Sequence, residues 1–430
     1  MGAPFVFVRT TIHSMSSRLP SYEEAAALVR GRAGVFGHRS HLTERVDLGA
    51  AFGRVLAEPV RTDSDQPPFD RSTRDGFACR ASEAAKHKWL TVMGSTRAGE
   101  VPAKPLDAGA AWEIMTGAAV PEGADAVAML EHVERDGDRV RLLPNRSLEA
   151  GDNVVPRGAE ARAGDEVMAA GTRLGVAQIA QAATCGYAVA EVFQRPRVAI
   201  LTTGDELVAV DAAPGPGQIR NSNGLMLAAL VTQAGGEPLL LPAASDTAES
   251  LDGALAKVTE ADLLLISGGV SAGKFDLVEP ALARLGAKFH FTGVRIQPGK
   301  PLVFGELSAV KRGADSVPFF GLPGNPISSA ATFLLFAAPV LAALSGCGQE
   351  GPRFALAKVS RDVKGKDELT RFIPAYCSFS GPSEKLPEVA PVRSQGSGDL
   401  VAFSRSNCFL VVPEEAERLE AGAIARILLV

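Results

Sequence analysis

The chain has 430 residues, which at roughly 150 residues per domain indicates about three domains. Its 46% hydrophobic and 22% charged residues are typical of a globular protein and exclude a disordered one. The net charge of −5 argues against a nucleic-acid partner, and because we find no apolar run near the ~18 residues of a membrane span, we expect neither a membrane segment nor a signal peptide.

The N-terminal part is predicted to be helical and then rich in strands. Residues 20–56 are predicted to be helical, because Ser21 and Glu24 form a capping box before an apolar run. A turn-rich stretch at 63–80 leads into short strands up to about residue 155, which predicts a small β-rich module. Residues 156–190 include a further helix and could rejoin the N-terminal helices, which would make the β-rich module an insertion.

Residues 195–345 show the clearest pattern, in which strands alternate with helices. Strands are predicted at 197–201, 262–267 and around 318, and helices at 224–236 and 246–261, the second capped by Asp246. This alternation predicts a doubly wound, mostly parallel sheet, whose ligand site lies beyond the carboxyl ends of its strands. The loops TTGDE, SGGVSAGKFD and GLPGNPISS all fall there. Short strands return at 350–430 and predict a terminal β domain.

The cysteines and histidines indicate no disulfide framework and no transition-metal site. The five cysteines are scattered without a CxxC, which is typical of buried thiols in a reducing cytoplasm. The histidines form neither HxH nor HExxH.

The loop SGGVSAGKF has the spacing of a phosphate loop but lacks one of its residues. Gly268, Gly273 and Lys274 satisfy GxxxxGK, whereas Phe275 stands where a Mg²⁺ ligand requires Ser or Thr. We therefore favour a glycine loop whose backbone amides approach a different kind of phosphate.

The loop GLPGNPISS combines a turn with the start of a helix. Asn325 is predicted at the N-cap and Pro326 at the first helical position, so that free amides at 327–329 would favour an anion. The same pattern also fits a well-capped helix without a ligand.

Acidic residues follow three of the predicted strands. Asp205 and Glu206 follow one, Asp246 another and Asp276 a third. Singly, each fits a cap or a solvated turn, but together they would repel one another unless a cation such as Mg²⁺ lay between them. Arg295 and Lys300 add positive charge suited to an oxyanion, although Lys300 equally fits an ordinary surface charge.

Ordered motifs in the chain resemble those of one family. PPFDRSTRDGFA resembles the PxFDNSAMDGYA signature of the MoeA family, the molybdopterin molybdenumtransferases, to which the E domain of gephyrin also belongs. Further family motifs follow in the same order: IMTGAAVPEGADAV, LTTGDEL, GQIRNSN, ISGGVSAGKFD, QPGKPLVFG, GLPGNPISS and SNCFLVV. The match runs from about Ser17 to Val430.

The resemblance implies a multidomain α/β plus β protein that forms an elongated homodimer. The implied domains are an N-terminal linker and dimerisation domain (17–62 and 156–192), an inserted β-rich domain (63–155), a molybdopterin-binding-like α/β domain (193–347) and a C-terminal β domain (348–430). The implied active cleft lies between the α/β domain of one subunit and the inserted domain of its partner. The implied reaction consumes adenylylated molybdopterin and molybdate and releases AMP and molybdenum cofactor in a Mg²⁺-dependent step. An upstream adenylyltransferase and the recipient molybdoenzymes are the implied protein partners.

The resemblance also implies roles for individual residues. Asp75 and Thr116 match functional residues of the inserted domain. Glu206, Asp246 and Asp276 match acidic residues of the α/β domain, as catalytic groups and Mg²⁺ ligands. The implied substrate and phosphate contacts are Gly268, Gly269, Ser271, Gly273, Arg295, Lys300, Gly324, Asn325, Ser328, Arg371 and Ser397.

Three departures from the family pattern weaken the prediction of the oxyanion contacts more than the prediction of the reaction. The signature Asn-Ser-Ala-Met is Arg71-Ser72-Thr73-Arg74 here, a family Asp is Glu160, and a frequent Lys is Gln297. Two other functions remain open, a molybdopterin adenylyltransferase and a non-catalytic scaffold. The inserted and C-terminal domains argue against the first, and the complete acidic set argues against the second.

Overall fold

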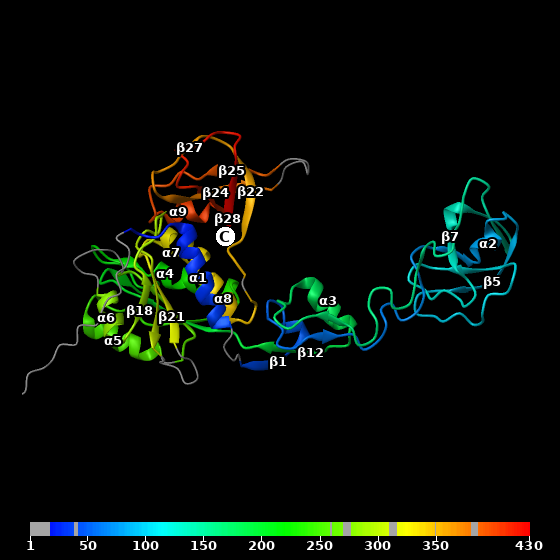
Figure 1. The fold of residues 1–430 in the computed structure, drawn as a ribbon, viewed down its shortest axis with the longest axis horizontal. Helices are drawn as coiled ribbons and strands as arrows, with labels where there is room; N and C mark the ends of the chain where they lie inside the picture. Colours follow the sequence, from blue (N-terminus) through cyan, green and yellow to red (C-terminus); the bar gives the residue numbers. More distant parts are fainter. Residues whose placement is uncertain are drawn as a thin grey trace, which may run out of the picture. The chain divides into compact units, whose positions relative to one another are not determined.

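The computed structural model describes residues 18–37, 42–258, 260–269, 277–308, 316–348, 350–379 and 386–430. The chain forms two compact units (Figure 1). Unit 1 comprises residues 1–44, 53–55 and 193–430, and unit 2 comprises residues 45–52 and 56–192.

Unit 1 is built on a six-stranded sheet. Its strand order is β16 (Glu237–Leu240), β13 (Arg197–Thr202), β17 (Leu263–Ser267), β21 (Ser316–Leu322), β20 (Val303–Ser308) and β18 (Lys288–Phe291). The first four strands are parallel to one another, whereas β20 is antiparallel to both of its neighbours, β21 and β18. The predicted mostly parallel sheet is therefore confirmed.

Helices cover both faces of this sheet. The helices α1 (Tyr22–Gly37), α4 (Ser222–Gln233), α7 (Pro326–Thr332) and α8 (Ala338–Leu344) share one core with the sheet. The helices α5 (Ala248–Leu255) and α6 (Val278–Arg284) cover the other face. Successive residues of β17 alternate between the two cores, Leu263 and Leu265 in one, Leu264 and Ile266 in the other. A strand buried on both faces reads as the continuous apolar run seen in the sequence.

The continuous helix from Pro326 to Leu344 corrects one expectation from the sequence. Its α7 and α8 segments are joined by a π-helical turn, Phe333–Ala337. The helix is long and apolar enough to cross a membrane, contrary to our reading that no run approached that length. However, 89% of this segment is buried inside the protein, as in the core helix of a globular fold.

Helix α1 begins as predicted but ends much earlier. The amide of Ser21 donates to Glu24 Oε2 at 2.7 Å, and that of Glu24 donates to Ser21 Oγ at 3.1 Å, which confirms the capping box. The helix ends at Gly37, and Thr43–Asp47 forms strand β1, so the predicted helix to residue 56 is wrong. The alternating, β-branched sequence TERVD explains the strand. Tyr22 packs edge-to-face on Phe336 and Phe372, so α1 shares the core of unit 1.

The boundaries of the four predicted domains stay a prediction.

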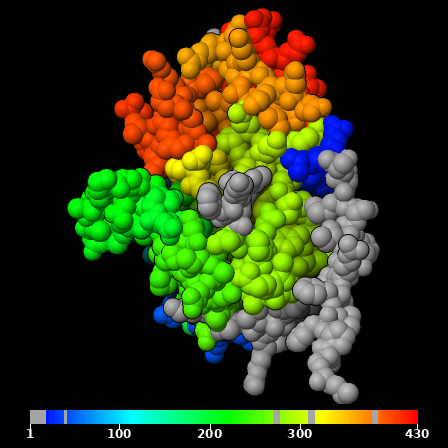
Figure 2. Space-filling model, turned by 90° about the vertical axis from the view of Figure 1, so that its left-hand side faces the viewer, coloured from blue at the N-terminus to red at the C-terminus, as the bar shows by residue number. Residues whose placement is uncertain are grey.

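The C-terminal part of unit 1 is a closed sheet. Its order is β19 (Ile296–Gln297), β24 (Thr370–Ser378), β25 (Glu388–Pro391), β22 (Phe354–Val359), β28 (Ile424–Leu429) and β26 (Cys408–Val412), and β24 also pairs with β26. A short helix, α9 (Leu400–Ser404), precedes β26 and contacts α7. Figure 2 shows this barrel, orange to red, directly against the green-to-yellow α/β part.

Unit 2 contains the predicted β-rich module. Its sheet has the order β7 (Ala126–Met129), β4 (Gly76–Cys79), β6 (Ala110–Ile114), β5 (Leu90–Thr96), β9 (Arg139–Leu142) and β8 (Val133–Asp136). Unit 2 also contains three short strand pairs: β1 with β12 (Val189–Phe193), β2 (Val60–Arg61) with β11 (Glu166–Met168), and β3 (Arg71–Ser72) with β10 (Val154–Val155). Its α-helices are α2 (Ala81–Ala84) and α3 (Val176–Thr184). The helix α3 lies where the sequence predicts one.

Candidate functional site

A cavity of about 410 Å³ lies in unit 1, at the carboxyl ends of β13, β17 and β21. This is the edge at which open parallel sheets bind ligands. The lining residues come from the loops after these strands and from the start of α4: Thr202, Thr203, Gly204, Glu206, Leu207, Ile219, Arg220, Asn221, Ser222, Asn223, Asp246, Ser267, Gly268, Gly269, Pro301, Pro323, Gly324, Asn325 and Pro326.

Glu206 reaches the cavity because Gly204 precedes it. A Cβ on Gly204 would stand 2.5 Å from Glu206 Oε2, and the residue has φ +147°. Only glycine therefore lets the carboxylate fold back over its own loop. The strands β14 (Leu207–Val208) and β15 (Ile219–Arg220) continue from this loop and return the chain to α4.

Asp246 lines the cavity instead of capping α5. The predicted cap is wrong by one residue, because Thr247 is the N-cap and its Oγ1 accepts from the Ser250 amide at 3.2 Å. The amide of Asp246 donates to Asp205 Oδ1 at 3.0 Å, which brings two acidic loops together. Burial, followed by the negative charges of Asp205 and Glu206, raises the pKa of Asp246 above its ordinary value. The site thus carries negative charge that a cation would balance.

The acidic side chains fit a hard, oxygen-liganded ion such as Mg²⁺ in donor chemistry and in charge. Glu206 and Asp246 both line the cavity. Asp276, the third predicted ligand, lies outside the described residues, and among the residues that the structure describes no group of three His, Cys, Asp or Glu is placed to hold a metal ion.

Two glycines end β17 in a conformation that side chains disfavour. Gly268 and Gly269 have φ of +101° and +61°, and a Cβ on Gly268 would lie 2.5 Å from the Thr203 carbonyl oxygen. The backbone at this point therefore lies directly against the end of β13. The rest of the predicted phosphate loop, including Ser271, Gly273 and Lys274, lies outside the described residues.

The start of α7 is less open to an anion than the sequence predicts. Asn325 is the N-cap and Pro326 the first helical residue, as expected. However, the Ile327 amide donates to the Ser397 carbonyl at 3.0 Å, and the Ser329 amide donates to the Asn325 carbonyl at 2.9 Å. Two of the three amides expected to be free are thus used, and among the amides of 327–329 only that of the buried Ser328 is left for an anion. Asn325 Nδ2 also donates to Ser397 Oγ at 2.9 Å, which brings the C-terminal domain to the cavity edge at Asn325.

The three predicted basic contacts do not line the cavity. Arg295 is buried and pairs with Glu414 at 3.1 Å. Arg371 donates to the Lys364 carbonyl, and burial lowers the pKa of its guanidinium. Lys300 is exposed, and its neighbour Pro301 lines the cavity instead.

Two asparagines at the start of α4 belong to the site, although the sequence patterns did not identify them as site residues. Asn221 accepts from the Gly224 amide at 3.1 Å as the N-cap of α4 and donates to Thr202 Oγ1 at 2.8 Å. Asn223 Nδ2 donates to Ser267 Oγ at 2.9 Å and to the Gly324 carbonyl at 2.6 Å. The two side chains join the ends of β13, β17 and β21 to α4. The signal was the segment NSN directly before an apolar helix, a typical N-cap sequence.

In unit 2 the structure brings Asp75 and Thr116 together. The Thr116 amide and hydroxyl donate to Asp75 Oδ1 at 2.6 and 2.9 Å. These two bonds, the amide first, hold the pKa of Asp75 below its ordinary value, so the exposed carboxylate is ionised at neutral pH. Gly76 begins β4 rather than a hairpin turn, and a Cβ there would lie 2.0 Å from the Ala128 carbonyl oxygen. The glycine is needed for close strand packing beside Asp75.

Comparison with known proteins places the chain in one family. A model of the MoeA N-terminal region (domains I and II) matches residues 20–186, a model of a probable molybdopterin binding domain matches 199–343, and a model of the MoeA C-terminal region (domain IV) matches 357–430. The chain belongs to the MoeA family. A molybdopterin molybdenumtransferase of Nostoc is 36% identical over 86% of this chain and 85% of its own length, and that of Bacillus subtilis is 34% identical over 90% of each.

A solved MoeA structure has the same fold. The molybdopterin biosynthesis MoeA protein of Pyrococcus horikoshii aligns with a TM-score of 0.74 at 30% identity, over 96% of this chain and 100% of that one. The cavity of this MoeA chain lies within the segment that matches the model of a probable molybdopterin binding domain.

Two departures from the MoeA signature contact each other. Arg71 Nη2 lies 2.9 Å from Glu160 Oε1, and both side chains are partly exposed. Arginine and glutamate replace an asparagine and an aspartate of the family pattern together. Glu160 keeps the negative charge of the family's aspartate and pairs with the positive charge that Arg71 adds.

Proposed function

We propose that this chain inserts molybdenum from molybdate into adenylylated molybdopterin and releases AMP. The observation that carries the proposal is the cavity of the molybdopterin-binding domain, with Glu206 and Asp246 in its wall. Its volume of about 410 Å³ suits part of a nucleotide-pterin. We place the reaction in the cytoplasm.

The proposed chemistry requires that the negative charge of the substrate phosphates is balanced and that oxo groups of molybdate leave as water. Mg²⁺, when bound, would be held by Glu206 and Asp246 and would offset charge on the phosphates. Asp276 is proposed as a third acidic group. The Thr116 amide and hydroxyl keep Asp75 anionic, so Asp75 is suited to accept or orient a proton and not to carry one in.

We also propose a homodimer in which the Asp75 and Thr116 pair of one subunit serves the cavity of the other. The support is the resemblance, which assigns Asp75 and Thr116 to the same reaction as the acidic residues of the cavity and places the inserted domain at the cavity of the partner. Molybdate is expected to contact Ser397 and Lys300 at the cavity edge.

The test is a single-turnover assay of AMP release by the full chain. Purified protein is mixed with adenylylated molybdopterin, with and without molybdate and Mg²⁺, and AMP is measured by chromatography. We expect release that depends on both ions, and a loss of about 100-fold or more in Glu206→Gln and Asp246→Asn, because each removes a charge from the site. Glu237→Gln, an exposed carboxylate outside the cavity, should keep wild-type activity.

Two results would contradict the proposal. One is AMP release that is the same with and without molybdate. The other is consumption of ATP in the presence of molybdopterin alone, which would indicate the preceding adenylylation step.

A further inference from the structure

Two helices, α4 and α7, begin at the wall of the cavity, and they differ in how many of their first amides are already hydrogen-bonded. At α7, the Ile327 amide donates to the Ser397 carbonyl, and the Ser329 amide donates to the Asn325 carbonyl. At α4, the Gly224 amide donates to the side-chain oxygen of Asn221. The first amides of a helix have no acceptor within it, and Ser222 and Asn223, whose amides are among these, both line the cavity.

Arg220 stands directly before this turn. Among the described residues that line the cavity, it is the one with a cationic side chain. Its Nε donates to the Val210 carbonyl at 2.9 Å, which anchors the guanidinium and leaves its terminal NH₂ groups for a ligand. A cation at a helix N-terminus opposes the helix dipole, so the arrangement is unfavourable until an anion lies between them.

A buried hydroxyl in the same cavity also lacks a partner. Thr203 is 5% exposed, and among the described residues its Oγ1 makes no hydrogen bond. An unpartnered buried hydroxyl is costly, whereas a phosphate oxygen would accept its proton. Arg220 would add a positive charge for that phosphate in a cavity whose wall also holds the carboxylates of Glu206 and Asp246.

We propose that Arg220, with the amides of Ser222 and Asn223, binds a phosphate group of the ligand and selects phosphorylated ligands over their nucleosides. We call this set the α4 anion subsite. The inference rests on the proposed function, because it assigns one phosphate of the adenylylated substrate to this turn. The chemical class is a phosphomonoester or diphosphate anion.

The test compares AMP with adenosine by isothermal titration calorimetry on the full chain. Wild-type protein should bind AMP more tightly than adenosine. Arg220→Gln should weaken AMP about tenfold or more and leave adenosine within about twofold, because it removes a charged fork from the phosphate alone. Arg220→Lys should fall between the two, since it keeps the charge and loses the fork.

The matched control is Arg361→Gln. Arg361 likewise donates to a backbone carbonyl, that of Pro391 at 2.6 Å, but lies outside the cavity. It should leave both affinities unchanged, and thermal unfolding should be the same for all three variants.

The outcomes separate the subsite from the reaction. Equal weakening of AMP and adenosine in Arg220→Gln, or unchanged AMP affinity, overturns the subsite even if molybdate-dependent AMP release persists. Selective loss of AMP binding supports the subsite even if turnover with molybdate fails. Wild-type protein that binds neither compound overturns the subsite, whereas the proposed reaction is overturned only by the AMP-release assay.

Discussion

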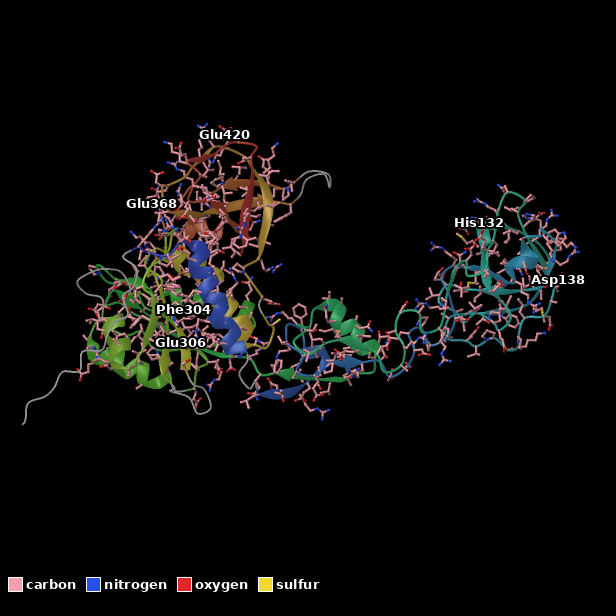
Figure 3. All side chains as sticks on the ribbon, in the orientation of Figure 1. His132, Asp138, Phe304, Glu306, Glu368 and Glu420 are labelled. Atoms are coloured by element: carbon pink, nitrogen blue, oxygen red, sulfur yellow. The ribbon has the colours of Figure 1, made fainter. Side chains whose placement is uncertain are left out.

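Glu306 on β20 is buried among partners from three other elements. Arg32 of α1 donates to its two oxygens at 2.7 and 2.8 Å, Ser316 Oγ donates at 2.6 Å, and His290 Nε2 lies 2.7 Å from Oε1. Figure 3 shows Glu306 and Phe304 beside α1. Burial alone would raise the pKa of Glu306, but the bonds from Ser316 and His290 and the charge of Arg32 outweigh it and lower the pKa.

Removing this carboxylate should destabilise unit 1. We expect Glu306→Ala to lower the free energy of unfolding by about 3 kcal/mol, because Arg32 and His290 lose their partner. The wild-type contribution should be fully present above the ordinary glutamate pKa of about 4.3, and should disappear as the pH falls below it through the lower pKa of the folded state. Urea unfolding at pH 7 and at pH 3 measures both effects.

The control for this prediction is Glu237→Ala at an exposed position. If the two variants lose equal stability at pH 7, or if the Glu306→Ala deficit is as large at pH 3 as at pH 7, the Glu306 network does not contribute as described.

Single residues were the hardest part of the site to predict from sequence. Glu306 and Arg220 look like ordinary surface charges in a linear reading, because the groups that surround them come from distant elements. Asp75 and Thr116 could be paired only through the resemblance, since the strands β4 and β6 that bring them together lie more than thirty residues apart.

At the scale of elements, the loop before α9 carries Ser397 to the cavity edge. Asp399 caps α9 through Oδ1, which accepts from the Ala402 amide at 3.0 Å, and closes the loop through Oδ2, which accepts from the Gln395 amide at 3.0 Å. These backbone bonds, that of Gln395 first, lower the pKa of Asp399. The carboxylate therefore performs two separable tasks.

Asp399→Asn should separate the two tasks. An asparagine keeps the capping oxygen but turns an NH₂ group toward the Gln395 amide, so the loop should open while α9 stays capped. We expect KM for molybdate to rise several-fold with kcat little changed, because about 1 kcal/mol of positioning is lost. Asp399→Ala, which loses both bonds, should in addition lower the melting temperature. An unchanged KM in Asp399→Asn would refute the positioning role.

Elements with a strong local signal were predicted well, and their ends were not. The capping box of α1 and the alternating strands and helices of the α/β part are local patterns, and the structure confirms them. The end of α1 at Gly37 and the shift of the α5 cap from Asp246 to Thr247 depend on competing neighbours. That one-residue shift decides whether Asp246 serves a helix or the cavity. The Ile327 amide was predicted wrongly because its acceptor, the Ser397 carbonyl, lies seventy residues away, whereas the acceptor of the Ser329 amide is the Asn325 carbonyl of the same turn.

At the scale of the whole molecule, the proposed shared site predicts complementation between subunits. Asp75→Asn and Asp246→Asn should each be inactive alone. Mixing equal amounts under conditions of subunit exchange should restore about a quarter of wild-type activity, because half of the dimers are mixed and each of these has one intact site. AMP release before and after exchange is the measurement.

The control mixes Asp75→Asn with Thr116→Val, whose defects lie in the same predicted half-site. That mixture should stay inactive. Recovery there would show that Asp75 and Thr116 do not act in the same half-site. No recovery with Asp246→Asn would place Asp75 and the cavity of a single subunit in the same site.

The packing of α1 against distant residues has a consequence for biosynthesis. Its aromatic contact Phe336 is translated 314 residues after Tyr22. At about 5 to 20 residues per second the emerging helix waits roughly 15 to 60 s before the surface that covers it has been synthesised. During that interval we expect the side chains that α1 buries in the folded chain to be open to chaperones, while the sequence of unit 2 is synthesised between the two.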